Sequence, residues 1–218
     1  MNVEGWRVGA WLALVGALAA IGYGSRAADG TPDDDVLYRY DTAISGIVVY
    51  LVLLLLVLWI ARGLPRREVF ALRQPPSWGR ALGLALAGYV VIFIGAGFLL
   101  WALDATEEQG LTPDAWDSSK AGAYAANFVA VALVGPIVEE LVYRGAGFTF
   151  FAGFGNAVAV GVTAVAFGLG HGLLLALPAL VFFGLVTGVL RARTRSVYPS
   201  TIVHCVFNAT SLILAVAV

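Results

Sequence analysis

Five ionisable side chains lie within the apolar stretches of the second half of the chain, namely Glu139, Glu140, Arg144, His171 and His204. An ionisable side chain inside a membrane costs free energy, so each of the five needs an explanation. Two carboxylates, a guanidinium and two imidazoles can together activate water and stabilise a tetrahedral intermediate. The chemistry that this set of groups predicts is amide hydrolysis.

The spacing of Glu139, Glu140 and Arg144 gives the two carboxylates different surroundings. Residues four apart lie about 40° from eclipsed on a helix, so Glu140 and Arg144 can form an ion pair. Glu139 points about 100° away from Glu140 and lacks such a partner. We expect Glu139 to face a cavity as a general base, with its proton affinity raised by burial. The alternative is a solvated carboxylate cluster at the end of a helix.

Gly135 and Pro136 directly precede the two carboxylates. Proline removes a backbone donor, so it can kink a helix and swing the acidic turn into the bundle. Proline also fits the first turn of a new helix. Both alternatives predict a change in the backbone where the carboxylates begin.

The two histidines stand close to residues that can assist them. His171 follows Phe167 by one helical turn in a glycine-rich run, and His204 precedes Asn208 by one turn. An imidazole and a carboxamide one turn apart can present two hydrogen-bond donors to an oxyanion. The alternative for His171 is a packing residue whose hydrogen bonds are satisfied, and the alternative for His204 and Asn208 is hydrogen bonding between helices. Cys205, next to His204, faces elsewhere, so a thiol nucleophile is a poor alternative.

The composition excludes several classes of protein. Of the 218 residues, 60% are hydrophobic and 12% are charged, and the formal net charge is −1. A soluble domain carries about twice that charged fraction. A soluble globular enzyme, a disordered chain and a nucleic-acid binder with a basic patch are excluded, and a single cysteine excludes a disulfide scaffold. We therefore expect an all-α, polytopic membrane helix bundle.

Uncharged stretches of the chain are long enough to cross a bilayer. A hydrocarbon core of about 30 Å needs roughly 20 apolar residues per helix. The stretches are 8–25, 43–61, 81–103, 121–138, 145–190 and 196–218. The stretch 145–190 is long enough to hold two spans. They predict about seven transmembrane helices in a single domain over residues 1–218. The first stretch has only a weak cleavage site, so we expect a retained helix rather than a signal peptide.

The charged loops predict the orientation in the cell membrane. Arginines gather at residues 61–80 and 191–195, and aspartates gather at 29–41 and 104–117. Basic loops favour the cytoplasmic side. With seven helices, the N-terminus is then cytoplasmic and the C-terminus external, and residues 139–144 lie near the cytoplasmic side.

The two histidines have different predicted depths. In a helix that begins near Asn156, His171 lies about 22 Å along the axis, whereas His204 lies about 10 Å into its own helix. They meet only if the helices tilt or if residues 172–178 re-enter the bundle. Irregular backbone is tolerated in a membrane where it lines a polar cavity. We therefore predict a shortened, broken or re-entrant element near the active site.

Three motifs, in this order, resemble those of the CAAX-protease and bacteriocin-processing (CPBP) family of intramembrane endopeptidases, which includes CAAX prenyl and abortive-infection type proteins. Glu139-Glu140-Leu-Val-Tyr-Arg144 is similar to its EExxxR motif, Phe167–His171 to FxxxH and His204–Asn208 to HxxxN. The resemblance covers about residues 120–215 as a protease core, whereas residues 1–119 form three predicted helices without motif residues.

The resemblance implies a role for each motif residue. Glu139 and His171 would activate water, and His204 and Asn208 would stabilise the oxyanion. Glu140, Arg144 and Phe167 would support the site. The resemblance leaves open a metal-free glutamate mechanism and a divalent metal such as Zn, held by Glu139, His171 and His204. The sequence lacks the HExxH zinc motif.

The implied partners are membrane lipid and a membrane-associated peptide or protein substrate, CAAX-like or another prokaryotic peptide, with no nucleic acid. Two other classes stay as alternatives. A proton-coupled or ion-coupled transporter predicts inverted halves and polar residues along a path, whereas here the polar residues cluster in one zone. A non-catalytic membrane scaffold is the other alternative, and the intact motifs argue against it.

Overall fold

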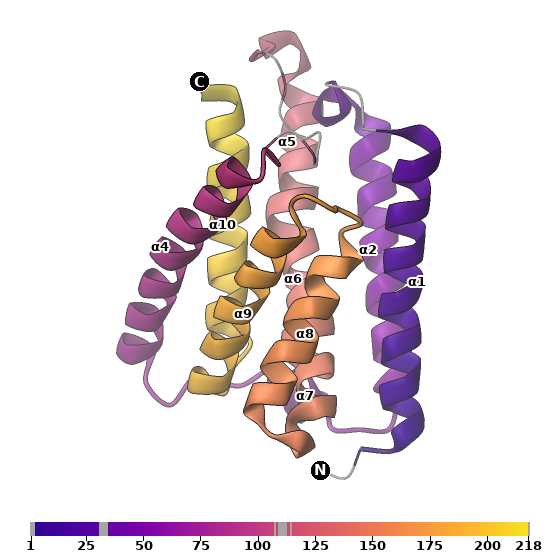
Figure 1. Cartoon of the computed structure of the whole chain (residues 1–218), viewed down its shortest axis with the longest axis vertical. Helices are drawn as coiled ribbons and strands as arrows, with labels where there is room; N and C mark the ends of the chain where they lie inside the picture. The colour runs from indigo at the N-terminus through magenta and orange to yellow at the C-terminus, as the bar shows by residue number, and fades with distance from the viewer. Residues whose placement is uncertain (1–2, 31–34, 107, 109–112, 114, 218) are drawn as a thin grey trace.

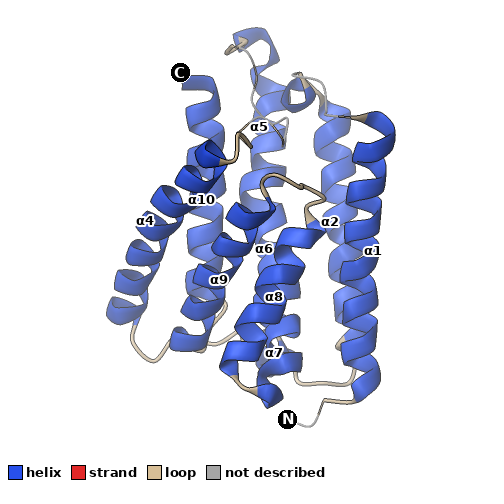
Figure 2. Cartoon of the chain, in the orientation of Figure 1, coloured by secondary structure: helices blue, strands red, loops and turns tan. Residues whose placement is uncertain are grey.

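The structure is a computed structural model, and it describes residues 3–30, 35–106, 108, 113 and 115–217. These residues form helices joined by loops and contain no β-strand (Figure 2). Six of the described helical segments are long and apolar enough to cross a membrane, and helix α8 is a shorter apolar helix. The long helices run along the long axis of the molecule (Figure 1). The prediction of a polytopic, all-α bundle is confirmed.

The long helices follow the uncharged stretches, because a helix satisfies its own backbone hydrogen bonds where water is absent. The described α-helices are α1 (Gly5–Asp29), α2 (Tyr40–Ile60), α3 (Arg66–Val69), α4 (Trp78–Ala102), α5 (Ala121–Val129), α6 (Gly135–Glu140), α7 (Phe148–Phe151), α8 (Asn156–Gly170), α9 (Leu177–Thr194) and α10 (Tyr198–Ala217). Most buried apolar side chains form one cluster between them, which includes the rings of Trp11, Phe167 and Phe183.

The fourth membrane-crossing helix is longer than predicted. One helical run, Ser118–Phe154, has 37 residues and contains α5, α6 and α7. The expected end of this span at Val138 and the expected start of the next at Gly145 are therefore wrong. The charges of Glu140 and Arg144 do not end the helix, because they lie 3.1 Å apart and neutralise each other inside the bundle.

This longer helix places the two carboxylates far from both of its ends. Glu139 lies about 22 Å of helix from the end of the run, at 1.5 Å per residue. That end lies next to the arginine-rich loops (Figure 1). The acidic pair is therefore well inside the bundle, which argues against the alternative of a solvated carboxylate cluster at the end of a helix.

Two π-helical segments, Ala130–Val134 and Leu141–Gly147, flank α6. Pro136 lies in the first turn of α6. The expected change in the backbone at Gly135 and Pro136 is thus a wide π-turn followed by a new α-helical segment. The missing N–H of proline is tolerated there, because the π-helical turn before it already interrupts the regular α-helical hydrogen bonds.

The wide turns leave backbone carbonyls that side chains of other helices bind. Three such hydrogen bonds come from α1, α9 and α10: Trp11 Nε1 to the Val142 carbonyl (3.0 Å), Arg191 Nε to the Arg144 carbonyl (3.0 Å) and Asn208 Nδ2 to the Val131 carbonyl (2.9 Å). An unpaired carbonyl is costly inside a membrane. These three side chains therefore stabilise the irregular helix that carries the carboxylates.

Helix α8 is too short to cross the hydrocarbon core. Its 15 residues span about 22 Å, against roughly 30 Å of hydrocarbon. The connection from α8 to α9, residues 171–176, therefore lies within the depth of the bundle, below the upper end of α1 (Figure 1). The prediction of a shortened element next to His171 is confirmed.

Helix α9 packs closely against α8 through two glycines. A Cβ atom on Gly184 would lie 2.7 Å from Cα of Ala164, and one on Gly188 would lie 3.1 Å from a methyl group of Val160. A larger side chain at Gly184 would push the two backbones apart, so this position requires glycine. The close approach sets the distance between the Phe167 and Phe183 rings, which stack with centroids 5.4 Å apart.

The two termini lie at opposite ends of the bundle (Figure 1). Six described helical runs are long enough to cross a membrane and α8 is not, so one of the seven predicted transmembrane helices is instead a short helix within the bundle. Residues 61–77 and 191–195, with their arginines, lie at the end where the N-terminus lies. That this end faces the cytoplasm stays a prediction.

Candidate active site

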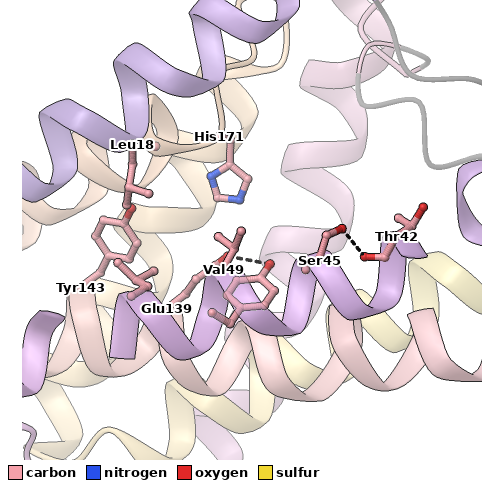
Figure 3. Close-up of a pocket in the computed structure, with 11 residues that line it drawn as sticks. Leu18, Thr42, Ser45, Val49, Glu139, Tyr143 and His171 are labelled. Atoms are coloured by element: carbon pink, nitrogen blue, oxygen red, sulfur yellow. Dashed lines mark hydrogen bonds between the residues drawn. The ribbon is translucent and has the colours of Figure 1, made fainter. Parts of the chain in front are cut away.

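A cavity of about 430 Å³ lies between α1, α2, α6 and the end of α8. Figure 3 shows its lining, in which side chains of α2 such as Thr42, Ser45 and Val49 form one wall. Two of the residues that the sequence predicts for catalysis, Glu139 and His171, reach this cavity from different helices. The cavity therefore joins the first two motifs of the sequence.

Glu139 is the acid of the cavity, and its side chain is 14% exposed. The Tyr50 hydroxyl donates a hydrogen bond to Oε1 of Glu139 at 3.3 Å. Oε2 of Glu139 lies 3.7 Å from Nε2 of His204. No arginine or lysine of the described chain pairs with Glu139, so no fixed cation occupies its carboxylate oxygens.

His171 follows the last residue of α8, and its imidazole points into the cavity (Figure 3). Nδ1 of His171 lies 2.8 Å from the carbonyl oxygen of Phe167, one helical turn earlier. A carbonyl only accepts, so Nδ1 carries the proton, and in the neutral ring Nε2 keeps its lone pair. The backbone of α8 thus selects the tautomer of His171 that can accept a proton from water at Nε2.

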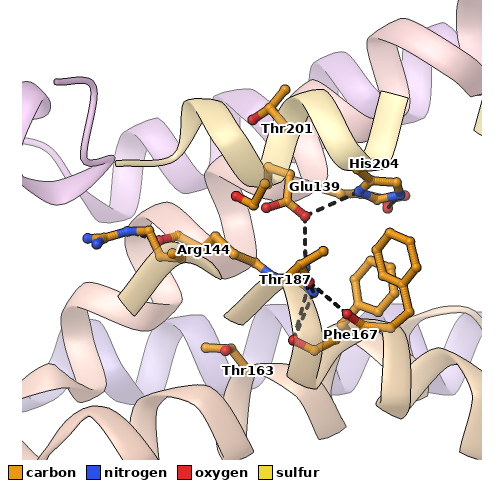
Figure 4. A network of polar contacts seen from close by, with 12 residues as sticks. Glu139, Arg144, Thr163, Phe167, Thr187, Thr201 and His204 are labelled. Carbon is orange, nitrogen blue, oxygen red and sulfur yellow. Dashed lines mark hydrogen bonds and ion pairs between the residues drawn. The ribbon is translucent and has the colours of Figure 1, made fainter. Parts of the chain in front are cut away.

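Behind Glu139, a buried network joins Glu140, Arg144 and His204 (Figure 4). Oε1 of Glu140 lies 3.1 Å from the Arg144 guanidinium and 3.2 Å from Nδ1 of His204. The side chains of Glu140 and Arg144 are fully buried. The ion pair expected from the four-residue spacing is present, and His204 lies between the two carboxylates, with one ring nitrogen facing each.

Arg144 also contacts the neighbouring helices. Its guanidinium donates to the Thr187 hydroxyl and, at 3.3 Å, to the Gly184 carbonyl, both on α9. It also lies over the ring of Phe167 on α8, 4.6 Å from the centroid. A cation over an aromatic face is attracted to the ring quadrupole. Arg144 therefore connects the helix of the two acids to both α8 and α9.

Phe167 brings the two histidines into one site. Its ring centroid lies 4.6 Å from that of His171 and 5.6 Å from that of His204. The two imidazoles are thus separated by a single aromatic ring, despite the different depths that their helices predict. The short α8 produces this arrangement, because it ends level with the middle of the bundle.

Asn208 lies outside this cluster. Its amide donates to the Val131 carbonyl at 2.9 Å, and neither Asn208 nor His204 is part of the cavity lining. The two residues share a face of α10 as expected, but only His204 approaches the acids. The oxyanion role of this pair stays a prediction.

Tyr50 is a site residue that the sequence analysis missed. It lies in the middle of α2 and contacts Glu139 from the helix opposite. Tyrosines of membrane helices gather at the two interfaces, so a tyrosine at mid-span is unusual and could have been noticed. Which of the later helices it would face could not be read from the sequence.

The three predicted metal ligands, Glu139, His171 and His204, do not come together as one set of ligands in this structure. Nowhere in the described residues do three His, Cys, Asp or Glu side chains group to hold a metal ion. Glu139 and His204 approach each other to 3.7 Å, but His171 does not complete the set. A catalytic zinc site needs three protein ligands at about 2.0–2.3 Å from the ion. Glu139, His171 and His204 are therefore not grouped as three ligands in this structure, and a metal ion at this site stays a prediction.

Helix α1 holds the backbone next to His171. Gly172 has a left-handed φ of +64°, and a Cβ atom on it would lie 2.5 Å from the carbonyl carbon of Gly22. The Tyr23 hydroxyl donates to the Leu173 carbonyl at 3.1 Å. The N-terminal helices, which carry no motif, therefore position one of the predicted catalytic residues.

Glu108, in the connection between α4 and α5, holds the loop that follows His171. Its carboxylate accepts hydrogen bonds from the backbone N–H groups of Leu174 (2.7 Å), Leu175 (3.0 Å) and Ala176 (2.6 Å). Burial acts to raise the pKa of Glu108, but the three N–H groups outweigh it and hold this pKa below its usual value. These three N–H groups lie directly before α9, where the positive end of the helix dipole favours a negative charge.

We expect the Glu108→Gln variant to unfold at a lower temperature than the wild type at pH 7, by about 2–4 °C. Because the folded pKa is depressed, the stabilisation by Glu108 is complete above the ordinary glutamate value and is lost as pH falls through the folded value. The difference in Tm should therefore shrink below about pH 4.5. Thermal unfolding in detergent between pH 7 and 3 measures it. Glu68→Gln, which removes an exposed carboxylate without an ion pair in the described chain, is the control. A difference in Tm that is constant with pH would contradict the expectation.

The comparisons with known proteins point to the same part of the chain. Residues 121–210 match the family model "Type II CAAX prenyl endopeptidase Rce1-like". No curated protein and no solved structure matches the chain. The matched residues contain all three motifs and extend from α5 to α10, so the resemblance to CPBP proteases is confirmed.

Proposed function

Since residues 121–210 match Rce1-like type II CAAX prenyl endopeptidases, we propose that this integral membrane protein is an intramembrane endopeptidase. Its substrate is a membrane-associated peptide or protein, CAAX-like or another prokaryotic peptide. One observation carries the proposal: Glu139 and His171, from separate motifs, line one cavity inside the bundle. That cavity offers the proton acceptors that hydrolysis needs in surroundings that otherwise contain few polar groups.

Glu139 acts as the general base. A water molecule between its carboxylate and Nε2 of His171 gives a proton to Glu139, and the water oxygen forms a bond to the carbonyl carbon of the substrate. The carbonyl oxygen then carries the negative charge of a tetrahedral intermediate. When the C–N bond breaks, Glu139 returns the proton to the leaving amine nitrogen, so the enzyme is regenerated.

The other residues support this step. Tyr50 positions Glu139 through its hydroxyl, 3.3 Å from Oε1, and Glu140 with Arg144 fixes the helix behind it. For the oxyanion we propose His204 and Asn208 as donors. His204 has support from its position 3.7 Å from Glu139. Asn208 has one of its two N–H groups free of the Val131 bond.

No step of this mechanism passes through a metal ion, since Glu139, His171 and His204 do not converge as three ligands. We also propose that the arginine-rich end of the bundle faces the cytoplasm, with the N-terminus on that side and the C-terminus outside. The partners are then membrane lipid and the peptide substrate, with no role for nucleic acid.

The test is peptide hydrolysis by the purified full chain in liposomes, with quenched prenylated CAAX peptides and other membrane peptides as substrates. We expect the wild type to cleave at least one peptide and the Glu139→Gln variant to cleave it far more slowly. Activity that persists with a zinc chelator supports the metal-free route, and activity lost to the chelator and restored by zinc contradicts it. Cleavage that is equal in Glu139→Gln would refute the proposed function, and so would no cleavage of any peptide, as a transporter or scaffold predicts.

A further inference from the structure

A second polar cavity, of about 250 Å³, lies at the arginine-rich end of the bundle. Its polar lining residues are Glu68, Arg73, Thr149, Asn156, Arg191 and Arg195. The volume is several times the roughly 30 Å³ that a water molecule occupies in the liquid. Three of the six residues are arginines and one is an acid, so the cavity has an excess of positive charge.

Arg191 is the buried cation of this cavity. It is only 5% exposed, although no carboxylate among the described residues pairs with it. Its Nε donates to the Arg144 carbonyl at 3.0 Å, and its guanidinium lies over the Phe148 ring, 4.7 Å from the centroid. These two contacts fix the plane of the guanidinium. In the described chain its two terminal nitrogens have no acceptor, so two parallel donors remain available at the cavity.

Two exposed arginines complete the positive side of the cavity. Arg73 donates from Nε to the carbonyl of Arg195 at 2.7 Å, which ties the loop after α3 to the end of α9. Glu68 lies on the same cavity, but none of the three arginines comes within ion-pair distance of it. The positive charge of the cavity is therefore not neutralised by the protein.

Helix α8 begins at this cavity. Asn156 is both its first residue and part of the lining, and Gly155 before it provides no side-chain cap. The positive end of the α8 dipole therefore adds to the charge of the arginines. Together, the fixed guanidinium and the helix start match the requirements of a phosphate, which binds to paired N–H donors of arginine and to helix N-termini.

We propose that Arg73, Arg191 and Arg195 form a phosphate-binding site that holds the headgroup phosphate of an anionic membrane lipid. The site lies at the arginine-rich end of the bundle, and positive loops at the end of a membrane helix attract anionic lipid headgroups. A lipid is therefore the source of phosphate that fits this location. The lipid site is independent of the peptide cavity, since the two cavities share no lining residue.

The test is thermal unfolding of the full chain in neutral detergent, titrated with three additives. These are phosphatidylglycerol, phosphatidylcholine with the same acyl chains, and inorganic phosphate. We expect a saturable rise in Tm with phosphatidylglycerol and at least a tenfold weaker apparent affinity in Arg195→Gln. Glu68→Gln should bind more tightly, because it removes the one negative charge of the cavity. Arg193→Gln is the matched control, since Arg193 lies in the same segment but outside this cavity.

The titrations and variants distinguish a lipid headgroup from free phosphate as the ligand. A rise with inorganic phosphate that depends on Arg195 supports the site but assigns it to free phosphate rather than lipid. An equal loss of affinity in Arg193→Gln and Arg195→Gln would show general charge attraction and overturn the proposal. No rise with phosphatidylglycerol or with inorganic phosphate, or an equal rise with phosphatidylcholine, would overturn it as well. None of these readouts depends on peptide hydrolysis, so the result does not depend on the proposed function.

Discussion

Replacing Glu139 with glutamine is expected to lower the rate of peptide hydrolysis by about 10²–10⁴-fold, the contribution of a positioned general base. The amide has the same shape as the carboxylate and can still accept the Tyr50 hydrogen bond. It cannot take a proton from water. The cavity and the fold should therefore persist, and the loss should appear in kcat. The measurement is the initial rate with a quenched peptide in liposomes, together with Tm.

Two further variants make this prediction sharper. Tyr50→Phe keeps the carboxylate but removes the hydroxyl 3.3 Å from it, so we expect a smaller loss of rate, with a change in its pH profile. Asp35→Asn removes an exposed carboxylate that lines neither of the two cavities and should leave the rate unchanged. A Glu139→Gln variant that retains more than half of the wild-type rate would rule out Glu139 as the base.

Removing one partner of the Glu140–Arg144 pair is expected to destabilise the protein by about 3–5 kcal/mol, because it leaves the other charge buried without its counter-ion. Both side chains are fully buried, and their charges lie 3.1 Å apart. For a chain of this size the loss corresponds to a fall in Tm of about 6–20 °C. Arg144→Met and Glu140→Gln each test it by thermal unfolding in detergent.

The double variant tests the cause. If the penalty comes from the unpaired charge, Arg144→Met with Glu140→Gln should be less destabilised than the sum of the two single variants. The interaction energy of this cycle should be at least about 1 kcal/mol, because the two groups are in direct contact. Strictly additive losses would show that the residues act through packing alone and would contradict the assigned pairing.

The sequence predicted the parts of this fold that depend on apolar runs. Helices α1, α2, α4 and α10 lie where the uncharged stretches place them. The fourth span did not end where predicted, because an internal ion pair cancels the two charges that were expected to end it. Neutralisation of that kind depends on burial, which a count of charged residues does not measure.

For the site, the four-residue spacing of Glu140 and Arg144 was sufficient to predict their pairing and the separate direction of Glu139. The role of Asn208 could not be foreseen in the same way. Its hydrogen bond goes to the carbonyl of Val131 in a π-helical turn, and such turns are rare within α-helices. Contacts between distant helices, such as that of Tyr50 with Glu139, depend on tertiary packing.

The short α8 also has a consequence for the lipid around the protein. Leu174 and Leu175, after its end, are exposed, and their backbone N–H groups are bonded to Glu108, so this loop can face acyl chains. Helix α8, about 22 Å long, is shorter than the hydrocarbon core of a bilayer of ordinary thickness. Hydrophobic mismatch of this kind is relieved when the membrane becomes locally thinner. The protein would then bring headgroups and water closer to His171 without opening the bundle itself.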